Sequence, residues 1–282
     1  MTSSAAATTR PQTTPGFLYA ALRIFDLSLG EMLWSRRTVF MVLVVGVPVL
    51  ISFVVRSLVA LGAPIMRNNT INGPIIFGMM IWVFFVRFSV PVLGVFYGTS
   101  LMADEVEDKT ITYLFTRPIP RGAVLVGKYF AYLACTIFVV LPSIALVWLL
   151  IVPLRGSLGA SVLDLARDLG LVAIGLAAYG AVFALIGAAM KRPLLVGLLY
   201  VFGWETLVMA LPGNLKRISV MYYLQGLVPH AMPSDSPLSL IQEMFRESPG
   251  ALTCLISLAV ICLIALWFAA RTVARREYVL EQ

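Results

Sequence analysis

The hydrophobic positions of this chain run in long stretches instead of alternating with polar positions. The stretches are apolar on all sides, carry almost no charge, and contain scattered Gly, Ala, Ser and Pro. This pattern indicates membrane helices, because a barrel strand would alternate in polarity, whereas a helix needs roughly 20 apolar residues to cross ~30 Å of hydrocarbon. It predicts an all-α integral membrane protein with six transmembrane helices, at about 38–61, 74–101, 129–152, 169–190, 193–212 and 250–270.

A different periodicity precedes the first span, in residues 16–37. Arg23 and Asp26 lie away from an apolar stripe that recurs at helical spacing. The stripe consists of Leu18, Leu22, Phe25, Leu29 and Leu33. It predicts an amphipathic interface helix that lies in the cytoplasmic surface of the membrane. A soluble amphipathic helix docked on a partner is the alternative.

The composition agrees with lipid as the solvent. Hydrophobic residues make up 60% of the 282 residues and charged residues only 12%, against roughly 25% charged in ordinary soluble domains. Residues 1–15, rich in Thr, Ser, Ala and Pro, are too polar to bury a core and are expected to form a disordered cytoplasmic tail. Residues 271–282 are expected to form a second cytoplasmic tail.

The basic residues predict the orientation, since Lys and Arg beside span ends are retained in the cytoplasm. Thirteen of the 21 fall on the side that holds both termini, six on the other side, and two inside spans. Both termini are therefore expected on the cytoplasmic side of the inner (plasma) membrane. Topology and anionic membrane lipids account for most of the net charge of +7, so no nucleic-acid partner is expected.

Residues 103–128, between the second and third spans, form the most informative loop. Four acids fall within Asp104–Asp108, an apolar patch surrounds Leu114, and prolines and arginines follow. The loop is too charged to enter lipid and too apolar for a bare linker. It predicts a short amphipathic helix, stopped by the prolines, that presents an apolar knob to another protein. A loop on the membrane surface is the alternative.

The same loop carries a family resemblance. An acidic cluster leads to a Thr, and then come Tyr-Leu-Phe-Thr-Arg-Pro-Ile-Pro-Arg and, at the head of the third span, Gly-Lys-Tyr. This order resembles the permeases of the ABC-2 transporter family, in which such a loop contains the coupling helix that docks on the ATP-binding subunit. The resemblance assigns the docking to Glu105, Thr110, Leu114, Arg117, Pro118, Arg121 and Lys128. Lys109 departs from the family pattern, since many relatives have Gly there.

The resemblance also implies the partners and the function. It implies an exporter permease that works with two copies of an ABC ATP-binding subunit and a second permease chain, as a homodimer or a related heterodimer. ATP and magnesium would be used by the partner, with no cofactor bound by this chain, which is therefore not expected to be an enzyme. A transporter-like scaffold or a signalling or immunity module that moves no solute is the alternative, and a transport assay separates the two.

Residues 122–128 imitate a nucleotide-binding loop. They match the first seven positions of the GxxxxGK pattern, but Tyr129 stands where a Ser or Thr should hold magnesium. No hydrophobic strand precedes the motif, and Lys128 opens a membrane span. We therefore expect no nucleotide site in this chain.

Three ionisable residues fall inside the predicted spans: Arg56, Arg87 and Glu205. An unpaired charge in lipid costs several kcal/mol, so such residues normally face the protein interior or find a partner. Our hypothesis is that Glu205 pairs with Arg56 or Arg87 and fixes the packing of the fifth span. The functional alternative is that Glu205 lines the translocation path.

Small residues and outer loops complete the prediction. Gly170, Gly175, Gly180 and Gly187 would let the fourth span approach its neighbours closely, in the bundle core or, as the alternative, at a dimer seam. The long outer loop 213–249 is expected to contain short helices that dip back into the outer leaflet. The three cysteines lack CxxC spacing and the single histidine stands alone, so no metal or catalytic site is expected.

Overall fold

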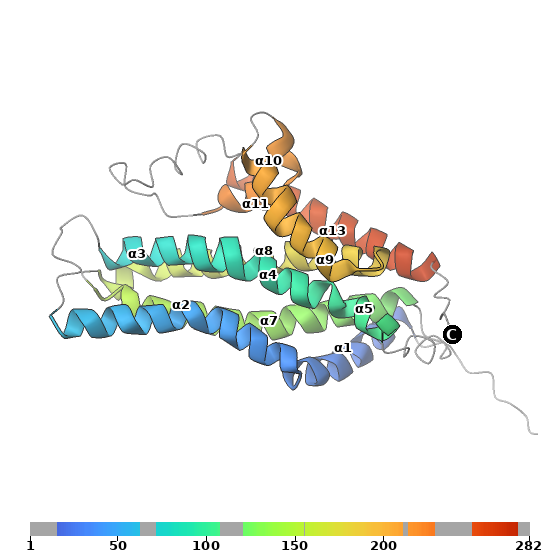
Figure 1. Cartoon of the computed structure of the whole chain (residues 1–282), viewed down its shortest axis with the longest axis horizontal. Coiled ribbons are helices and arrows are strands. Elements are labelled where there is room, and N and C mark those ends of the chain that lie inside the picture. Colours follow the sequence, from blue (N-terminus) through green and yellow to red (C-terminus); the bar gives the residue numbers. More distant parts are fainter. Residues whose placement is uncertain are drawn as a thin grey trace, which may run out of the picture.

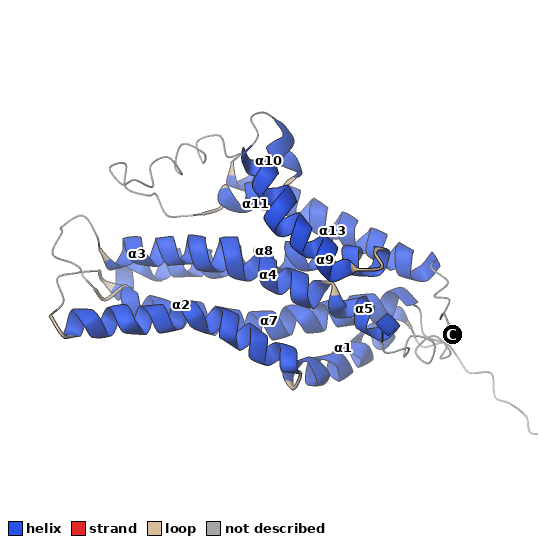
Figure 2. Ribbon diagram, in the orientation of Figure 1, coloured by secondary structure: helices blue, strands red, loops and turns tan. Residues whose placement is uncertain are grey.

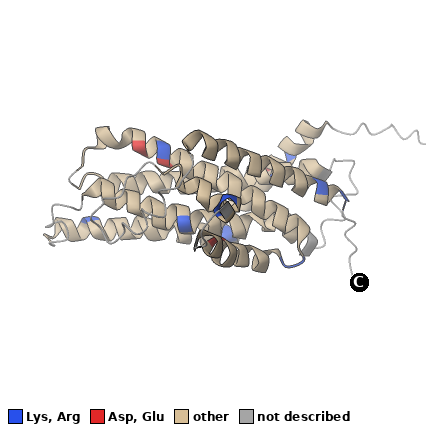
Figure 3. Cartoon of the chain, turned by 90° about the horizontal axis from the view of Figure 1, so that it is seen from above, with Lys and Arg blue, Asp and Glu red and all other residues tan. Residues whose placement is uncertain are grey.

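The computed structural model describes residues 16–62, 72–107, 121–154, 156–210, 214–228 and 250–275. Every regular element in these ranges is a helix and none is a strand (Figure 2). Charged residues are sparse along the ribbon (Figure 3). The prediction of an all-α membrane protein is confirmed.

The elements follow one another along a chain that repeatedly reverses direction (Figure 1). The first half consists of α1 Phe17–Leu33, α2 Arg36–Ala60, α3 Gly73–Met80, η2 Ile81–Ser89, α4 Val90–Leu93, η3 Gly94–Gly98 and α5 Ser100–Glu107. The second half consists of α7 Arg121–Ile151, α8 Leu158–Ala189, α9 Pro193–Leu198, η4 Leu199–Glu205, α10 Thr206–Ala210, η5 Asn214–Ile218, α11 Val220–Gln225 and α13 Ala251–Arg275. The segments η2, η3 and η4 are π-helical, and η5 is a 3₁₀-helix.

Five helices are long and apolar enough to cross a membrane. They are Arg37–Ala60, Gly73–Ala103, Gly122–Ile151, Leu158–Ala189 and Ala251–Arg275. The segment expected as the fifth span forms a shorter apolar helix, Pro193–Met209. The third and fourth helices begin well before the expected residues 129 and 169, because hydropathy reports the part of a helix that suits lipid, whereas backbone hydrogen bonds carry the helix beyond it.

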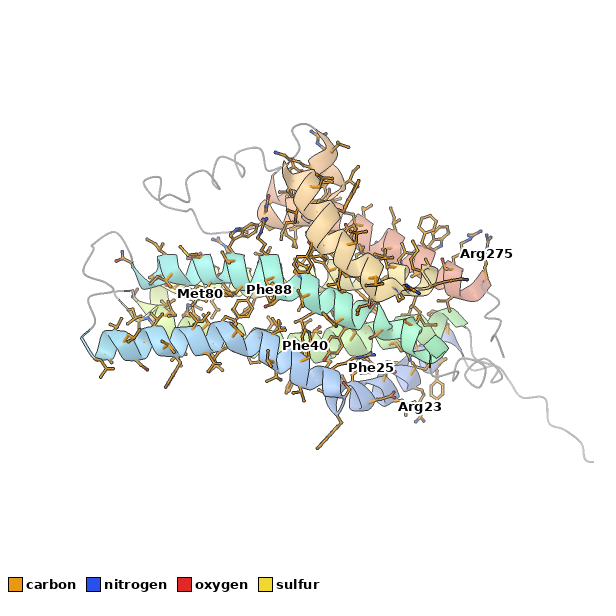
Figure 4. All side chains as sticks on the ribbon, in the orientation of Figure 1. Arg23, Phe25, Phe40, Met80, Phe88 and Arg275 are labelled. Carbon is orange, nitrogen blue, oxygen red and sulfur yellow. The ribbon has the colours of Figure 1, made fainter. Side chains whose placement is uncertain are left out.

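The long helices run side by side along the bundle, and α13 slants along it (Figure 1). Helix α2, the rod from α3 to α5, α7 and α8 share the long axis. The arm formed by α9, η4 and α10 leaves this bundle at an angle, and α13 returns to the end where α5 and the start of α7 lie. Arg23 of α1 and Arg275 of α13 are found toward this same end (Figure 4).

Helix α8 is the core of the bundle, because it contacts α7, α13, α9, α11 and the rod from η2 to α5. Its glycines make these contacts close. A Cβ at Gly180 would overlap the ring of Tyr132, and one at Gly187 would overlap the backbone carbonyl of Thr99. Gly175 is also buried, whereas Gly170 is exposed with nothing within 4 Å of its missing Cβ. The bundle-core interpretation is thus confirmed for three of the four glycines.

The rod packs on α2 through an aromatic contact and a hydroxyl–sulfur contact. The rings of Phe40 and Phe96 lie 4.6 Å apart between centroids, and the Ser52 hydroxyl donates to the sulfur of Met80 at 3.4 Å. Phe40 and Met80 mark this contact in Figure 4. Helix α2 leaves much of its other face exposed, as expected for a helix whose outer side meets lipid.

Helix α1 packs along α7 with a face of small residues. Ala20, Ala21, Ile24 and Ser28 are buried, and the missing Cβ of Gly127 would lie 2.6 Å from the carbonyl oxygen of Ala21. The predicted apolar stripe lies elsewhere on the helix. Its members Leu18, Leu22 and Leu33 are exposed, and Phe25 and Leu29 are half-buried.

Replacing Gly187 with Ala should destabilise the bundle by about 1–3 kcal/mol, because the obstacle is the Thr99 backbone, which cannot rotate away as a side chain can. Gly170→Ala, on the same helix but in open space, is the matched control and should change stability by less than ~0.5 kcal/mol. Unfolding midpoints of the purified variants in detergent measure both. Equal midpoints for the two variants would contradict the close approach of α8 and the rod.

Candidate functional site

The predicted coupling loop leaves the bundle at one end. Residues 108–120 lie outside the described residues, and with them Thr110, Leu114, Arg117 and Pro118. The backbone of Glu105 belongs to α5, Arg121 opens α7, and Lys128 is half-buried about two turns further into α7. Helices α5 and α7 contact each other, so both stems of the loop emerge side by side (Figure 1).

The two stems stand on a small apolar core of their own. Met102 of α5 and Leu125 of α7 are buried together with Ala188 of α8 and with Ala269 and Val273 of α13. This cluster joins four helices directly beside the loop. A displacement of either stem must therefore be passed on to α8 and α13, because close-packed interiors do not deform locally.

The start of α7 also touches both ends of the described chain. A Cβ at Gly122 would lie 3.7 Å from the ring of Phe17 in α1 and 3.8 Å from Ala270 in α13. The loop stems, the interface helix and the last helix thus form one contiguous end of the molecule.

Glu205 lies at a second site, between η4, α8 and α11. It is only 4% exposed. The Tyr179 hydroxyl donates to Oε2 at 2.5 Å, the Ser219 hydroxyl donates to Oε1 at 3.2 Å, and the Met221 backbone N–H donates to the same oxygen at 3.4 Å. The carboxylate is therefore stabilised by hydroxyl and amide donors from two other segments.

The expected arginine partner of Glu205 is not in direct contact with it. Arg56 and Arg87 are both exposed, and within the described residues neither forms an ion pair with Glu205. Depth along a span can be counted from the sequence, but the direction of a side chain depends on how the helices pack. Glu205 points to α8 and α11, while both arginines are exposed and Arg87 acts only indirectly on the site, through Tyr179.

Glu205 acts as a helix cap supplied from a distant segment. Ser219 precedes α11 with an extended backbone, φ −85° and ψ 137°, so the first amides of α11 have no partner within the helix. The carboxylate of Glu205 accepts one of them, and a negative charge is favoured at that helix end. Val220, Met221 and Leu224 bury the same short helix against the bundle. Glu205 thus ties η4 to α11.

Several buried polar groups were not predicted. Asp168 is fully buried because α8 begins at Leu158, which brings into the helix a residue expected to lie in an outer loop. The Tyr129 hydroxyl donates to the Ala177 carbonyl at 2.9 Å, and the Tyr132 hydroxyl donates to the Leu176 carbonyl at 3.0 Å. The three-residue spacing of the two tyrosines, which places them on one helix face, is the only sequence signal for this link between α7 and α8.

Removing the Glu205 carboxylate should loosen α11. Glu205→Ala is expected to cost about 1–3 kcal/mol, since it leaves buried hydroxyl and amide donors without an acceptor. Hydrogen exchange of the amides in Val220–Gln225 measures the effect and should accelerate. Asp164→Ala, which removes an exposed ion pair with Arg167, is the control and should leave that exchange unchanged. Unaltered protection of α11 in Glu205→Ala would contradict the cap.

Comparison with known proteins places this helical bundle in a family. The family model described as ABC-2 family transporter protein matches residues 50–273, from α2 through nearly all of α13. No curated protein matches the chain. The match covers most of the sequence and includes both sites described above, and permeases of this family work with ABC ATPase subunits. The chain therefore belongs to the ABC-2 transporter family and is a multi-pass membrane protein of the permease type.

Proposed function

We propose that this chain is the permease subunit of an ATP-driven exporter in the inner (plasma) membrane, with both termini in the cytoplasm. The observation that carries the proposal is the family match over the whole apolar bundle. ATP and magnesium act in a separate ABC subunit, of which the complex holds two copies. A second permease chain, identical or related, completes the transporter, and this chain binds no cofactor.

Six spans fit the path of the chain. Pro193–Met209 has 17 residues, which is near the lower limit of roughly 17–25 residues for a membrane helix. As a fifth span it would place η5 and α11 on the outer side, opposite the coupling loop. Helix α1 would then lie at the cytoplasmic surface, with its exposed leucines in the headgroup region and its alanine face on α7.

The coupling loop is proposed to carry the motion of the ATPase into the membrane. Its apolar residue Leu114 would enter a groove of the partner, surrounded by Glu105, Thr110, Arg117, Pro118, Arg121 and Lys128. The packing of both stems on α8 and α13 supports this role. Closure of the two ATPase subunits would move the stems and, through α8, switch the access of the bundle from one side to the other.

Glu205 is proposed to be a structural residue. Its burial and its three donors support a role in holding α11 on the bundle, whereas a path-lining carboxylate would need contact with solute. In a scaffold that moves no solute, the same contacts would serve a signalling motion. Only a transport assay with reconstituted complex separates those two functions.

Cysteine labelling tests the orientation. Thr116→Cys, in the coupling loop, should react with a membrane-impermeant maleimide only after cells are permeabilised, and Leu215→Cys, 48% exposed in η5, should react in intact cells. The background should be low, because Cys135 and Cys254 are buried and Cys262 is half-buried. Labelling of both variants from the same side would contradict the assignment of Pro193–Met209 as a membrane span.

A substitution in the coupling loop tests the ATPase partnership. Leu114→Asp should lower co-purification of the ATP-binding subunit at least about tenfold, since an apolar anchor at an interface centre contributes 2 kcal/mol or more. Leu163→Asp, an exposed position at the far end of α8, is the control and should co-purify normally. Normal co-purification and ATP hydrolysis with Leu114→Asp would overturn the assignment of the loop.

A further inference from the structure

Arg87 occupies an unusual place for a charge in a membrane protein. It is the fifteenth of the 31 residues in the helix Gly73–Ala103, and its side chain is exposed. At 1.5 Å per residue it lies roughly 21 Å from one helix end and 24 Å from the other. The middle of the hydrocarbon lies about 15 Å from either headgroup layer, which an arginine side chain cannot span. Arg87 therefore cannot reach the membrane surface as arginines near helix ends do.

Arg56 makes the contrast clear. It is also an exposed arginine in a span, but it lies four residues before the end of α2 at Ala60, roughly 6 Å along the axis. Its guanidinium can reach the headgroups. Only Arg87 needs a partner at the depth of the hydrocarbon.

No acid of the described residues forms an ion pair with Arg87, although its charge acts on Tyr179, whose hydroxyl donates to Glu205. Asp168 and Glu205 are buried, and Asp164 pairs with Arg167. Within the described residues, no hydrogen bond or ion pair of the Arg87 side chain is found. A second copy of these helices packed on this face would bring no exposed carboxylate at that depth. Within the described residues, the Arg87 guanidinium therefore has no directly bonded anionic partner.

The surroundings of Arg87 form an apolar strip with the charge at its inner end. Met79 and Val83 precede Arg87 at four-residue steps on the same helix face and are 38% and 39% exposed, and Phe88 beside it is 45% exposed. From Ser89 to Val95 every residue is buried. The exposed strip thus begins at Met79 and ends at Arg87 and Phe88.

The exposed strip ends where the arm begins to cover the rod. Gly197 of α9 lies against Val95 and Thr99, so the arm covers the inner half of the rod. Farther along, α10 and α11 diverge from the rod, and Phe88 lies below this divergence (Figures 1 and 4). Leu224 of α11 and Val90 both meet Gly175, which closes the bundle just beyond Arg87. Among the described residues, the arm covers the rod only beyond Arg87, and Met79, Val83 and Phe88 remain exposed.

We propose that Arg87 binds the anionic group, a phosphate or a carboxylate, of an amphiphile whose apolar chain lies along Met79 and Val83, and that this amphiphile is the class of molecule the transporter moves. The assignment of the cargo rests on the proposed export function. A guanidinium can hold a phosphate or carboxylate with two parallel hydrogen bonds, and burial in hydrocarbon strengthens them. The apolar strip supplies the remaining contact area.

The test uses the full-length chain in discs of phosphatidylcholine, with and without the ATP-binding subunit. The probes are oleoyl lysophosphatidic acid and its zwitterionic counterpart, oleoyl lysophosphatidylcholine, with phosphatidylglycerol as a representative bilayer lipid. Binding is measured by native mass spectrometry on the permease alone, and stimulation of ATP hydrolysis on the complex. The variants are Arg87→Gln, Arg87→Lys and the control Arg56→Gln.

The wild-type chain should prefer lysophosphatidic acid to lysophosphatidylcholine by roughly tenfold or more, the effect of one charge-assisted contact, and the complex should hydrolyse ATP faster with it. Arg87→Gln should lose the preference, Arg87→Lys should keep part of it, and Arg56→Gln should keep all of it. The lysine variant controls for folding, because it retains the charge and the length of the side chain.

Four results would overturn the proposal. The first two are an unchanged preference in Arg87→Gln and an equal loss in Arg56→Gln. The third is a preference that appears only when Asp235, Glu243 and Glu247 are neutralised to their amides, and the fourth is binding of phosphatidylglycerol with no probe stimulating hydrolysis. The third result would mean that the chain itself pairs the arginine, and the fourth that the site holds bilayer lipid. Failure of the export function is distinguished by the permease binding the probe while no ATPase subunit associates with it.

Discussion

The contact between α8 and its neighbours decides how the other helices can be placed. Gly180 receives the ring of Tyr132 from α7, and Gly187 lies on the Thr99 carbonyl of the rod. In lipid there is no hydrophobic drive to bring helices together, so close van der Waals packing over small residues has to supply it. With α7 and the rod packed on α8, α1 and α2 pack on α7, and α13 packs on α8 and α7.

This packing also creates the places where polar groups can survive in hydrocarbon. The hydroxyls of Tyr129 and Tyr132 reach carbonyls of α8 because the helices lie close enough for a ring to span the gap. Glu205 is tolerated because Tyr179, Ser219 and Met221 surround its carboxylate with donors. A buried polar group costs little only when it is fully bonded, so each of these contacts fixes a helix in one position.

The loop stems, Glu205 and Arg87 lie in different parts of the molecule. At one end of the molecule, Met102 and Leu125 of the loop stems pack against α8 and α13. In the proposed function, a displacement of the stems by the ATPase would reach α8 through this contact. At the other side of α8, Glu205 secures α11. Between them, Arg87 stays exposed at mid-depth on an apolar strip. Motion entering at the stems would thus pass along α8 before it reaches the strip and α11.

The sequence by itself determined the class of protein, the approximate places of the long helices, the glycine-rich core helix and the family. It could do so because lipid imposes length and apolarity on each span independently of the others, and because the coupling-loop motif is local. The shorter fifth helix was also found at its expected place. Sequence could not give the partner of Glu205 or the burial of Asp168, since side-chain direction depends on the rotation of each helix about its own axis. Only the tertiary structure decided that Glu205 faces donors and Arg87 faces outward, because packing on α8 sets those rotations.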